Sequence, residues 1–83
     1  MKLSKYVKFR EEKFGGVLFE TQSEKVFTLN PTAAAVVREI RDGVNEDQIA
    51  ARIAERFNGD TGTIRQEVSS LLSDLRSRGL VED

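Results

Sequence analysis

The side chains that carry most enzyme chemistry, histidine and cysteine, are both absent from this 83-residue sequence. The chain therefore lacks the commonest general base, the thiolate nucleophile and the most frequent ligands of transition metals. Of the carboxylates, Glu11 and Glu12 lie in a charged turn at the end of a predicted strand, and adjacent side chains of a strand point to opposite faces. The glycines at 15 and 16 lack the following Lys-Ser/Thr of a phosphate loop. We therefore predict no catalytic residue, no metal site and no cofactor, and expect that the chain is not an enzyme.

Three strands are predicted in the first part of the chain. Residues 6–11 alternate between apolar and polar side chains, which is typical of a strand. The glycines at 15 and 16 favour a turn, because glycine accepts positive φ. Residues 16–20 and 25–29 are rich in β-branched and aromatic side chains and predict two further strands joined by a short polar loop.

The four-residue loop between the second and third strands also predicts their register. It places Glu20 opposite Lys25, as a charge pair that closes the hairpin. In this register Val17, Phe19 and Val26 share one face, while the other face is apolar as well. An ordinary half-buried hairpin has one polar face, so either the rest of the domain or a partner should cover the second one.

Helical periodicity then replaces strand alternation, and it predicts helices over residues 31–42, 46–57 and 61–78. The predicted order of elements is therefore β-β-β-α-α-α in a single domain of residues 1–83. We assign the chain to the α+β class, as a winged-helix-like fold with a three-stranded antiparallel β-meander before three helices.

Polar residues at the expected helix starts support these boundaries. Asn30 before a proline predicts the first N-cap, and Asn45 with Gln48 predicts a capping box at the second helix. Asp60 or Thr61 is expected to cap the third helix. After its glycine stop, residues 80–81 are expected to fold back on the last helical turn.

Two binding functions remain open after catalysis is excluded. A helix-turn-helix regulator would use Arg65 and Gln66 at the start of the third helix to contact bases. The formal net charge is −1, however, and arginines of the last two helices are balanced by carboxylates, so phosphate binding should be weak. The other function is peptide binding: the third strand is an edge, which an extended peptide can complete as a further strand. We favour the peptide-binding interpretation and keep the regulator as the alternative.

The cellular setting is predicted from what the sequence lacks. No apolar stretch approaches the length of a membrane span, and the first residues do not contain the apolar segment of a signal peptide. We expect a cytoplasmic protein with no membrane partner and no nucleic-acid partner. Five positive charges fall within residues 1–13, and a solvated terminal strand is the favoured interpretation of them over an acidic partner.

The sequence also resembles a known family. A β-meander leading into LNPTAAAVVREI, followed by NEDQIAARIAERF and VSSLLSDLRSRGLVED, is similar to the PqqD-like family, also called the RiPP recognition element. The similarity extends over about residues 5–82. It implies a peptide chaperone that binds the leader segment of a ribosomally made precursor peptide. The peptide would add to the third strand and be presented to a modifying enzyme, often of the radical SAM type.

Carried over to this chain, the resemblance implies a recognition strand and one side of the last helix. The main chain of the strand is the stronger prediction; the side chains of Phe27, Val68 and Leu75 could equally belong to the core. A homodimer through the same edge strand is an alternative use of it. The implied peptide-binding residues are Lys25, Val26, Phe27, Thr28, Leu29, Val68, Leu71, Leu75 and Arg78.

Overall fold

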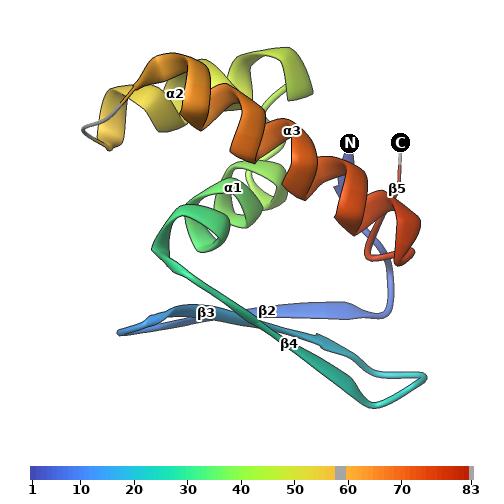
Figure 1. The fold of residues 1–83 in the computed structure, drawn as a ribbon. Helices are drawn as coiled ribbons and strands as arrows, with labels where there is room; N and C mark the ends of the chain where they lie inside the picture. Colours follow the sequence, from blue (N-terminus) through green and yellow to red (C-terminus); the bar gives the residue numbers. More distant parts are fainter. Residues whose placement is uncertain (58–59, 83) are drawn as a thin grey trace.

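A computed structural model describes residues 1–57 and 60–82 of the chain. Three antiparallel strands precede three helices, so the predicted α+β fold is confirmed (Figure 1). The main elements agree with the predicted ranges to within one residue. In chain order they are β1 (Lys2–Leu3), β2 (Val7–Glu12), β3 (Gly15–Glu20), β4 (Lys25–Leu29), α1 (Pro31–Arg41), α2 (Glu46–Arg56), α3 (Thr61–Ser77) and β5 (Val81–Glu82).

The two short strands β1 and β5 were not predicted from the sequence. They pair antiparallel, with Lys2 opposite Glu82, and so bring the two ends of the described chain side by side (Figure 1). The predicted fold-back after α3 does occur. Gly79 has a φ of 73°, and the Leu80 N–H donates to the carbonyl of Leu75 at 3.0 Å, as in a Schellman cap. This turn buries Leu80 and directs the next residues toward β1.

The main sheet has the strand order β2-β3-β4, and its predicted register is correct, with Glu20 opposite Lys25. Gly15 is required at the start of β3. Its φ is 141°, and a Cβ there would lie 2.1 Å from the carbonyl oxygen of Leu29. The absence of a side chain therefore lets the β2–β3 turn approach the junction between β4 and α1.

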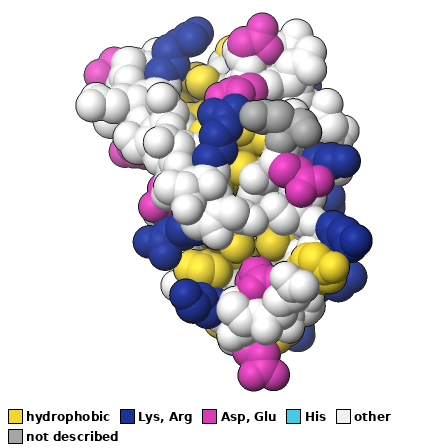
Figure 2. Space-filling view, turned by 90° about the vertical axis from the view of Figure 1, so that its right-hand side faces the viewer, with side chains coloured by type: hydrophobic (Ala, Val, Ile, Leu, Met, Phe, Trp, Pro, Cys, Tyr) yellow, Lys and Arg dark blue, Asp and Glu magenta, His cyan; other side chains and the backbone are white. Residues whose placement is uncertain are grey.

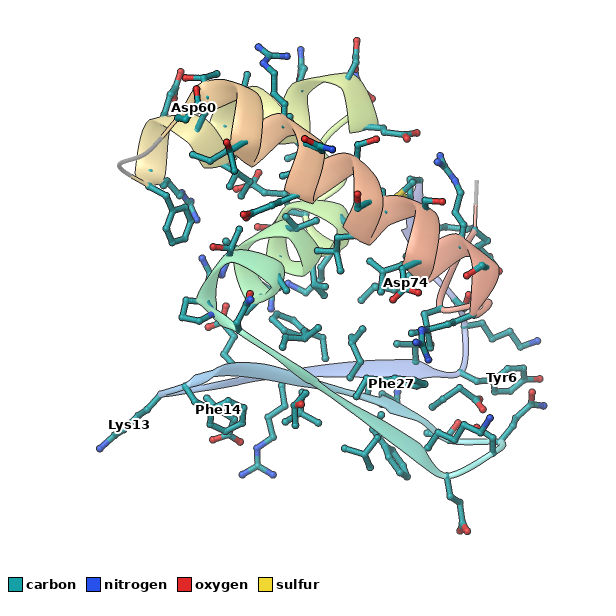
Figure 3. The ribbon with its side chains drawn as sticks, in the orientation of Figure 1. Tyr6, Lys13, Phe14, Phe27, Asp60 and Asp74 are labelled. Atoms are coloured by element: carbon teal, nitrogen blue, oxygen red, sulfur yellow. The ribbon has the colours of Figure 1, made fainter. Side chains whose placement is uncertain are left out.

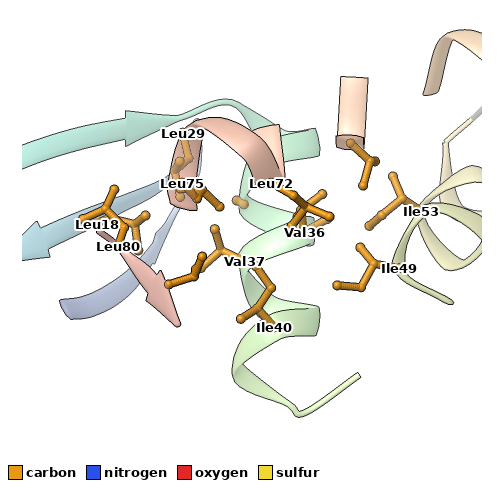
Figure 4. Packing of buried hydrophobic residues seen from close by; sticks show 14 of the residues in the cluster. Leu18, Leu29, Val36, Val37, Ile40, Ile49, Ile53, Leu72, Leu75 and Leu80 are labelled. Atoms are coloured by element: carbon orange, nitrogen blue, oxygen red, sulfur yellow. The ribbon is translucent and has the colours of Figure 1, made fainter. Parts of the chain in front are cut away.

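The hydrophobic core lies between one face of this sheet and the helices, with α1 in the centre (Figures 1 and 4). Leu18 of β3 is fully buried beneath α1, and Ile49 and Ile53 of α2 are buried on the other side of that helix. The second face of the sheet is left uncovered: Phe19 is 37% and Val26 58% exposed. Of the two covers expected for this apolar face, the domain itself or a partner, the rest of the described chain does not provide the first.

Two of the predicted helix caps are present and one prediction is wrong. The Asn30 side chain accepts a hydrogen bond from the N–H of Ala33 at 2.8 Å, and Asp60 caps α3 in the same way. Asn45 is the N-cap residue of α2, but its side chain makes no capping hydrogen bond. The Gln48 N–H donates instead to the main-chain carbonyl of Asn45 at 2.9 Å, so backbone bonding already satisfies this donor.

A buried carboxylate ties α1 to α2. Glu39 is 2% exposed and accepts a hydrogen bond from Nε of Arg52 at 2.6 Å, with Arg56 at 3.5 Å. A buried carboxylate costs little only when it is paired in this way. Among the helices of the described residues, none has the length and apolar character that crossing a bilayer requires.

Candidate functional site

The free edge of β4 presents main-chain groups to solvent. In the described residues β4 pairs with β3 alone. Hydrogen bonds alternate along an antiparallel ladder. Thr21 directly follows β3 and Tyr6 directly precedes β2, and the N–H of Thr21 donates to the carbonyl of Tyr6 at 2.9 Å. Counting back by two from Thr21, Phe19 and Val17 also bond to β2. The residues between them bond to β4.

This alternation fixes which groups of β4 are available. Leu18 bonds toward β4, and its partner there is Phe27. The neighbours of Phe27, Val26 and Thr28, consequently direct their N–H and C=O groups away from the sheet. Both residues are exposed. An extended segment placed beside β4 would therefore find two donors and two acceptors at the spacing of a strand.

Two depressions lie along α3, one beside this edge and one beyond its end at the start of α1, and we treat them together as one groove. The end beside the β3–β4 hairpin has a volume of about 300 Å³ and is lined by Glu20, Ser23, Lys25, Phe27, Arg78 and Leu80. The end beside the start of α1 has a volume of about 400 Å³ and is lined by Asn30, Thr32, Ala33, Thr63, Gln66, Glu67, Ser70 and Leu71. We call these the hairpin end and the helix end of the groove.

Contacts between Phe27 and Arg78 join the two walls at the hairpin end. Phe27 lies on the side of β4 that faces the helices (Figure 3). The Arg78 guanidinium lies over its ring, with Cζ 5.3 Å from the ring centroid. Nε of Arg78 also donates to Oδ2 of Asp74, one turn earlier, at 3.1 Å. The stack places a cation on the groove and keeps the end of α3 close to β4.

Residues of the β3–β4 loop bind the carboxylate of Glu20 at the end of β3. The Ser23 hydroxyl donates to Glu20, and the N–H groups of Gln22 and Ser23 donate to it at 2.9 and 2.7 Å. These bonds, the hydroxyl above all, lower the pKa of Glu20, whereas the charge of Lys25 contributes least. The predicted Glu20–Lys25 pairing is thus correct in register, but the carboxylate is bound mainly by its loop. The same loop contains Glu24 at a φ of 61°.

The structure separates the nine predicted site residues into groove, edge and core. Lys25, Phe27, Leu71 and Arg78 line the groove. Val26 and Thr28 provide the open main-chain groups. The other three are buried below the surface: Leu29 is 6%, Val68 2% and Leu75 3% exposed. Their side chains belong to the hydrophobic core, and Val68 also lines a separate depression between α2 and α3.

Most residues of the helix end were missed by the sequence analysis. On α3 they recur at helical spacing, as Thr63, Gln66 or Glu67, and Ser70 or Leu71. The core side of α3 was predicted from its apolar side chains at helical spacing. The groove side carries mostly polar side chains at the same spacing, so this pattern does not identify it. Only Leu71, one position before the buried Leu72, was predicted as a peptide-binding residue at this end.

The surface shows no strong charge of one sign on the face that Figure 2 displays. Small apolar patches there are bordered by both acidic and basic side chains (Figure 2). In residues 1–57 and 60–82 the acidic side chains form no group of three that could hold a metal ion. The arrangement offers main-chain hydrogen bonds, an apolar floor and scattered charges, which are the means of recognising an extended polypeptide.

Comparison with known proteins agrees with this geometry. The family described as "Coenzyme PQQ synthesis protein D (PqqD)" matches residues 15–81. The chain belongs to the PqqD family. A curated relative, the PqqA binding protein of Rhizobium meliloti (strain 1021), is 27% identical over 82 residues, covering 99% of this chain and 84% of that protein.

Two solved structures show the same fold. TbiB1, determined in complex with the TbiA(beta) leader peptide, matches with a TM-score of 0.87 at 22% identity, over 99% of this chain and 95% of that one. Streptococcus suis SuiB, determined with bound S-adenosylmethionine, matches with a TM-score of 0.52 at 18% identity. That match covers 92% of this chain but 23% of SuiB, so a fold of this kind can form part of a much longer chain.

Proposed function

We propose that this PqqD-family protein binds the leader segment of a ribosomally made precursor peptide and presents it to a modifying enzyme of the radical SAM type. The observation that carries the proposal is the free edge of β4 beside the groove, with Val26 and Thr28 directing their main-chain groups outward. The leader adds to this edge as a fourth strand, and its side chains contact α3. The protein itself catalyses no step.

Three relatives support the parts of this proposal. One is a PqqA binding protein, and another was determined with a leader peptide bound. SuiB, whose structure contains S-adenosylmethionine, supports a radical SAM enzyme as the recipient of the peptide. Since precursor peptides are made on ribosomes, we place this step in the cytoplasm. Any cofactor of the reaction belongs to the enzyme.

Main-chain bonds to Val26 and Thr28 supply much of the affinity in this proposal, and side chains set the specificity. Phe27 and Leu71 provide apolar contacts and Arg78 a charged one. The buried residues Val68 and Leu75 act by holding α3 in place. A second copy of the chain is another potential occupant of the same edge, and sedimentation of the free protein would detect it.

Nucleic acid is not a partner in this proposal, because carboxylates offset most of the positive charge of the last two helices. Residues 46–78 contain five arginines. Within residues 1–57 and 60–82, carboxylates pair with four of these arginines: Glu39 pairs with Arg52 and Arg56, Glu46 with Arg76, and Asp74 with Arg78. These carboxylates offset the positive charge of the arginines, which weakens any binding to a DNA backbone.

An NMR titration tests the proposed function. The probe is a synthetic peptide spanning the leader of a candidate precursor peptide. We expect large amide shifts at Val26 and Thr28, together with shifts along the groove side of α3. Strand addition is refuted if the β4 amides stay unchanged while the peptide binds elsewhere. Duplex DNA, titrated in the same way, should produce no shifts that depend on salt.

A further inference from the structure

The two ends of the groove differ in which hydrogen-bonding groups they leave unused. At the hairpin end the unused groups are donors. Lys25 forms no ion pair within the described residues, and Arg78 uses only Nε for Asp74, which leaves the N–H groups of its two terminal nitrogens. The one carboxylate lining this end, Glu20, already accepts three hydrogen bonds from its loop.

At the helix end the unused charged side chain is an acceptor. Glu67 lines this end and has no hydrogen bond or ion pair within the part of the chain that the structure describes. The other polar side chains there, such as Gln66 and Ser70, are neutral, and Leu71 with Ala33 forms an apolar floor. The groove therefore runs from cationic donors at one end to a carboxylate over an apolar floor at the other.

We infer that the groove selects a leader segment with an acidic side chain at the hairpin end and an apolar side chain at the helix end. This inference rests on the proposed function and specifies its ligand. An aspartate or glutamate of the leader accepts hydrogen bonds from Lys25 and Arg78. A leader bound in the reverse direction would place its acid against Glu67, so the same charges also reject the wrong orientation.

Strand geometry turns this selectivity into a sequence pattern. Side chains of an added strand point toward α3 at every second residue. The acidic and apolar residues are therefore separated by an even number of positions. Antiparallel pairing is slightly more stable per residue than parallel pairing. A leader running opposite to β4 meets the helix end first, so the acidic residue follows the apolar one in its sequence.

A selection from displayed random peptides tests the inference without knowledge of the natural precursor. With the native protein as bait, we expect enriched peptides to contain Asp or Glu an even number of positions after an apolar residue. Charge reversal by Lys25→Glu should abolish this acidic preference or convert it to Lys or Arg. The matched control is Lys13→Glu, an equal reversal at the exposed β2–β3 turn, which should leave the selected pattern unchanged.

Affinities of one selected peptide provide the second measurement. Lys25→Glu should weaken its binding by about tenfold, since it replaces an attractive surface pair by a repulsive one. Arg78→Gln provides an independent variant at the same end. Replacement of the acidic residue in the peptide should then cause little further loss in Lys25→Glu. Peptides that bind at β4 without any acidic preference would overturn the inference and leave the proposed function intact. Failure to enrich any peptide would count against the proposed function itself.

Discussion

Proline substitutions along β4 test the most specific consequence of the structure, namely that open and bonded main-chain groups alternate along this strand. Thr28→Pro removes an N–H that points away from the sheet, whereas Thr28→Ala keeps it. The residue before a proline is restricted to extended conformations, which Phe27 already adopts as part of a strand. Thr28→Pro should therefore leave the fold intact and weaken only strand addition.

The size of the effect follows from the number of groups involved. Val26 and Thr28 together offer two donors and two acceptors to an added strand. Loss of one donor leaves a carbonyl of the bound peptide without a partner, at a cost of about 1 to 3 kcal/mol. This corresponds to a loss of roughly fivefold to 150-fold in affinity. Val26→Pro should have a similar effect, while Thr28→Ala should change the affinity by less than about twofold.

Phe27→Pro provides the contrast, because the N–H of Phe27 bonds to β3. That variant should lower the free energy of unfolding, since it removes a hydrogen bond inside the sheet. The assay is fluorescence anisotropy of a labelled selected peptide, with thermal melts of each variant followed by circular dichroism. Equal affinities of Thr28→Pro and Thr28→Ala would refute strand addition at this edge. A melting temperature for Thr28→Pro as low as that of Phe27→Pro would refute the assigned alternation.

Three further predictions concern stability. Gly15→Ala should cost about 3 kcal/mol or more, because a Cβ there would lie 2.1 Å from a carbonyl oxygen at a φ of 141°; urea denaturation measures it, with Gly62→Ala as a control that meets no atom closer than 3.7 Å. Glu24→Gly should raise the unfolding free energy by about 0.5 to 1 kcal/mol and the melting temperature by a few degrees, since it relieves a φ of 61°; Glu24→Ala should give no such gain. The lowered pKa of Glu20 stabilises the fold at pH values above its ordinary pKa of 4.5, and this contribution is lost as pH falls through the lowered pKa. The free energy of unfolding should therefore depend less on pH in the acid range for Glu20→Gln than for the native protein. Identical pH dependence of the two would contradict the bonding of this loop.

The sequence predicted the order and limits of the main elements well because their signals are local. Strand alternation, helical stripes and the glycines at turns each arise within a few residues. The β1–β5 pair could not be predicted in this way, since each strand has two residues and its partner lies at the other end of the chain. Only the fold-back of Leu80 on α3, a tertiary contact, brings these two segments together.

For the candidate site too, local features were predicted from the sequence and tertiary ones were not. The edge position of β4 follows from strand order, so the main-chain prediction needed little tertiary information. The apolar stripe of α3, in contrast, mixes core and groove positions, because a helix that supports a groove buries the same kinds of side chain. The structure resolves this ambiguity by burying Val68 and Leu75 while leaving Leu71 partly exposed. Lys25 and Glu67 are far apart in the sequence and belong to no common motif. Their positions at the two ends of the groove are therefore seen only in the folded structure.

The position of α3 also explains how this chain can keep an open edge. An exposed strand edge invites pairing with other sheets, and proteins often protect such edges by covering them with a helix. Here the C-terminal end of α3 approaches the edge, where Arg78, directly after the helix, stacks on Phe27. A lone extended peptide fits beside β4 because it brings no helix of its own. A second copy would bring its own α3 to the same space, so the helix that forms one wall of the groove favours a single strand over another sheet.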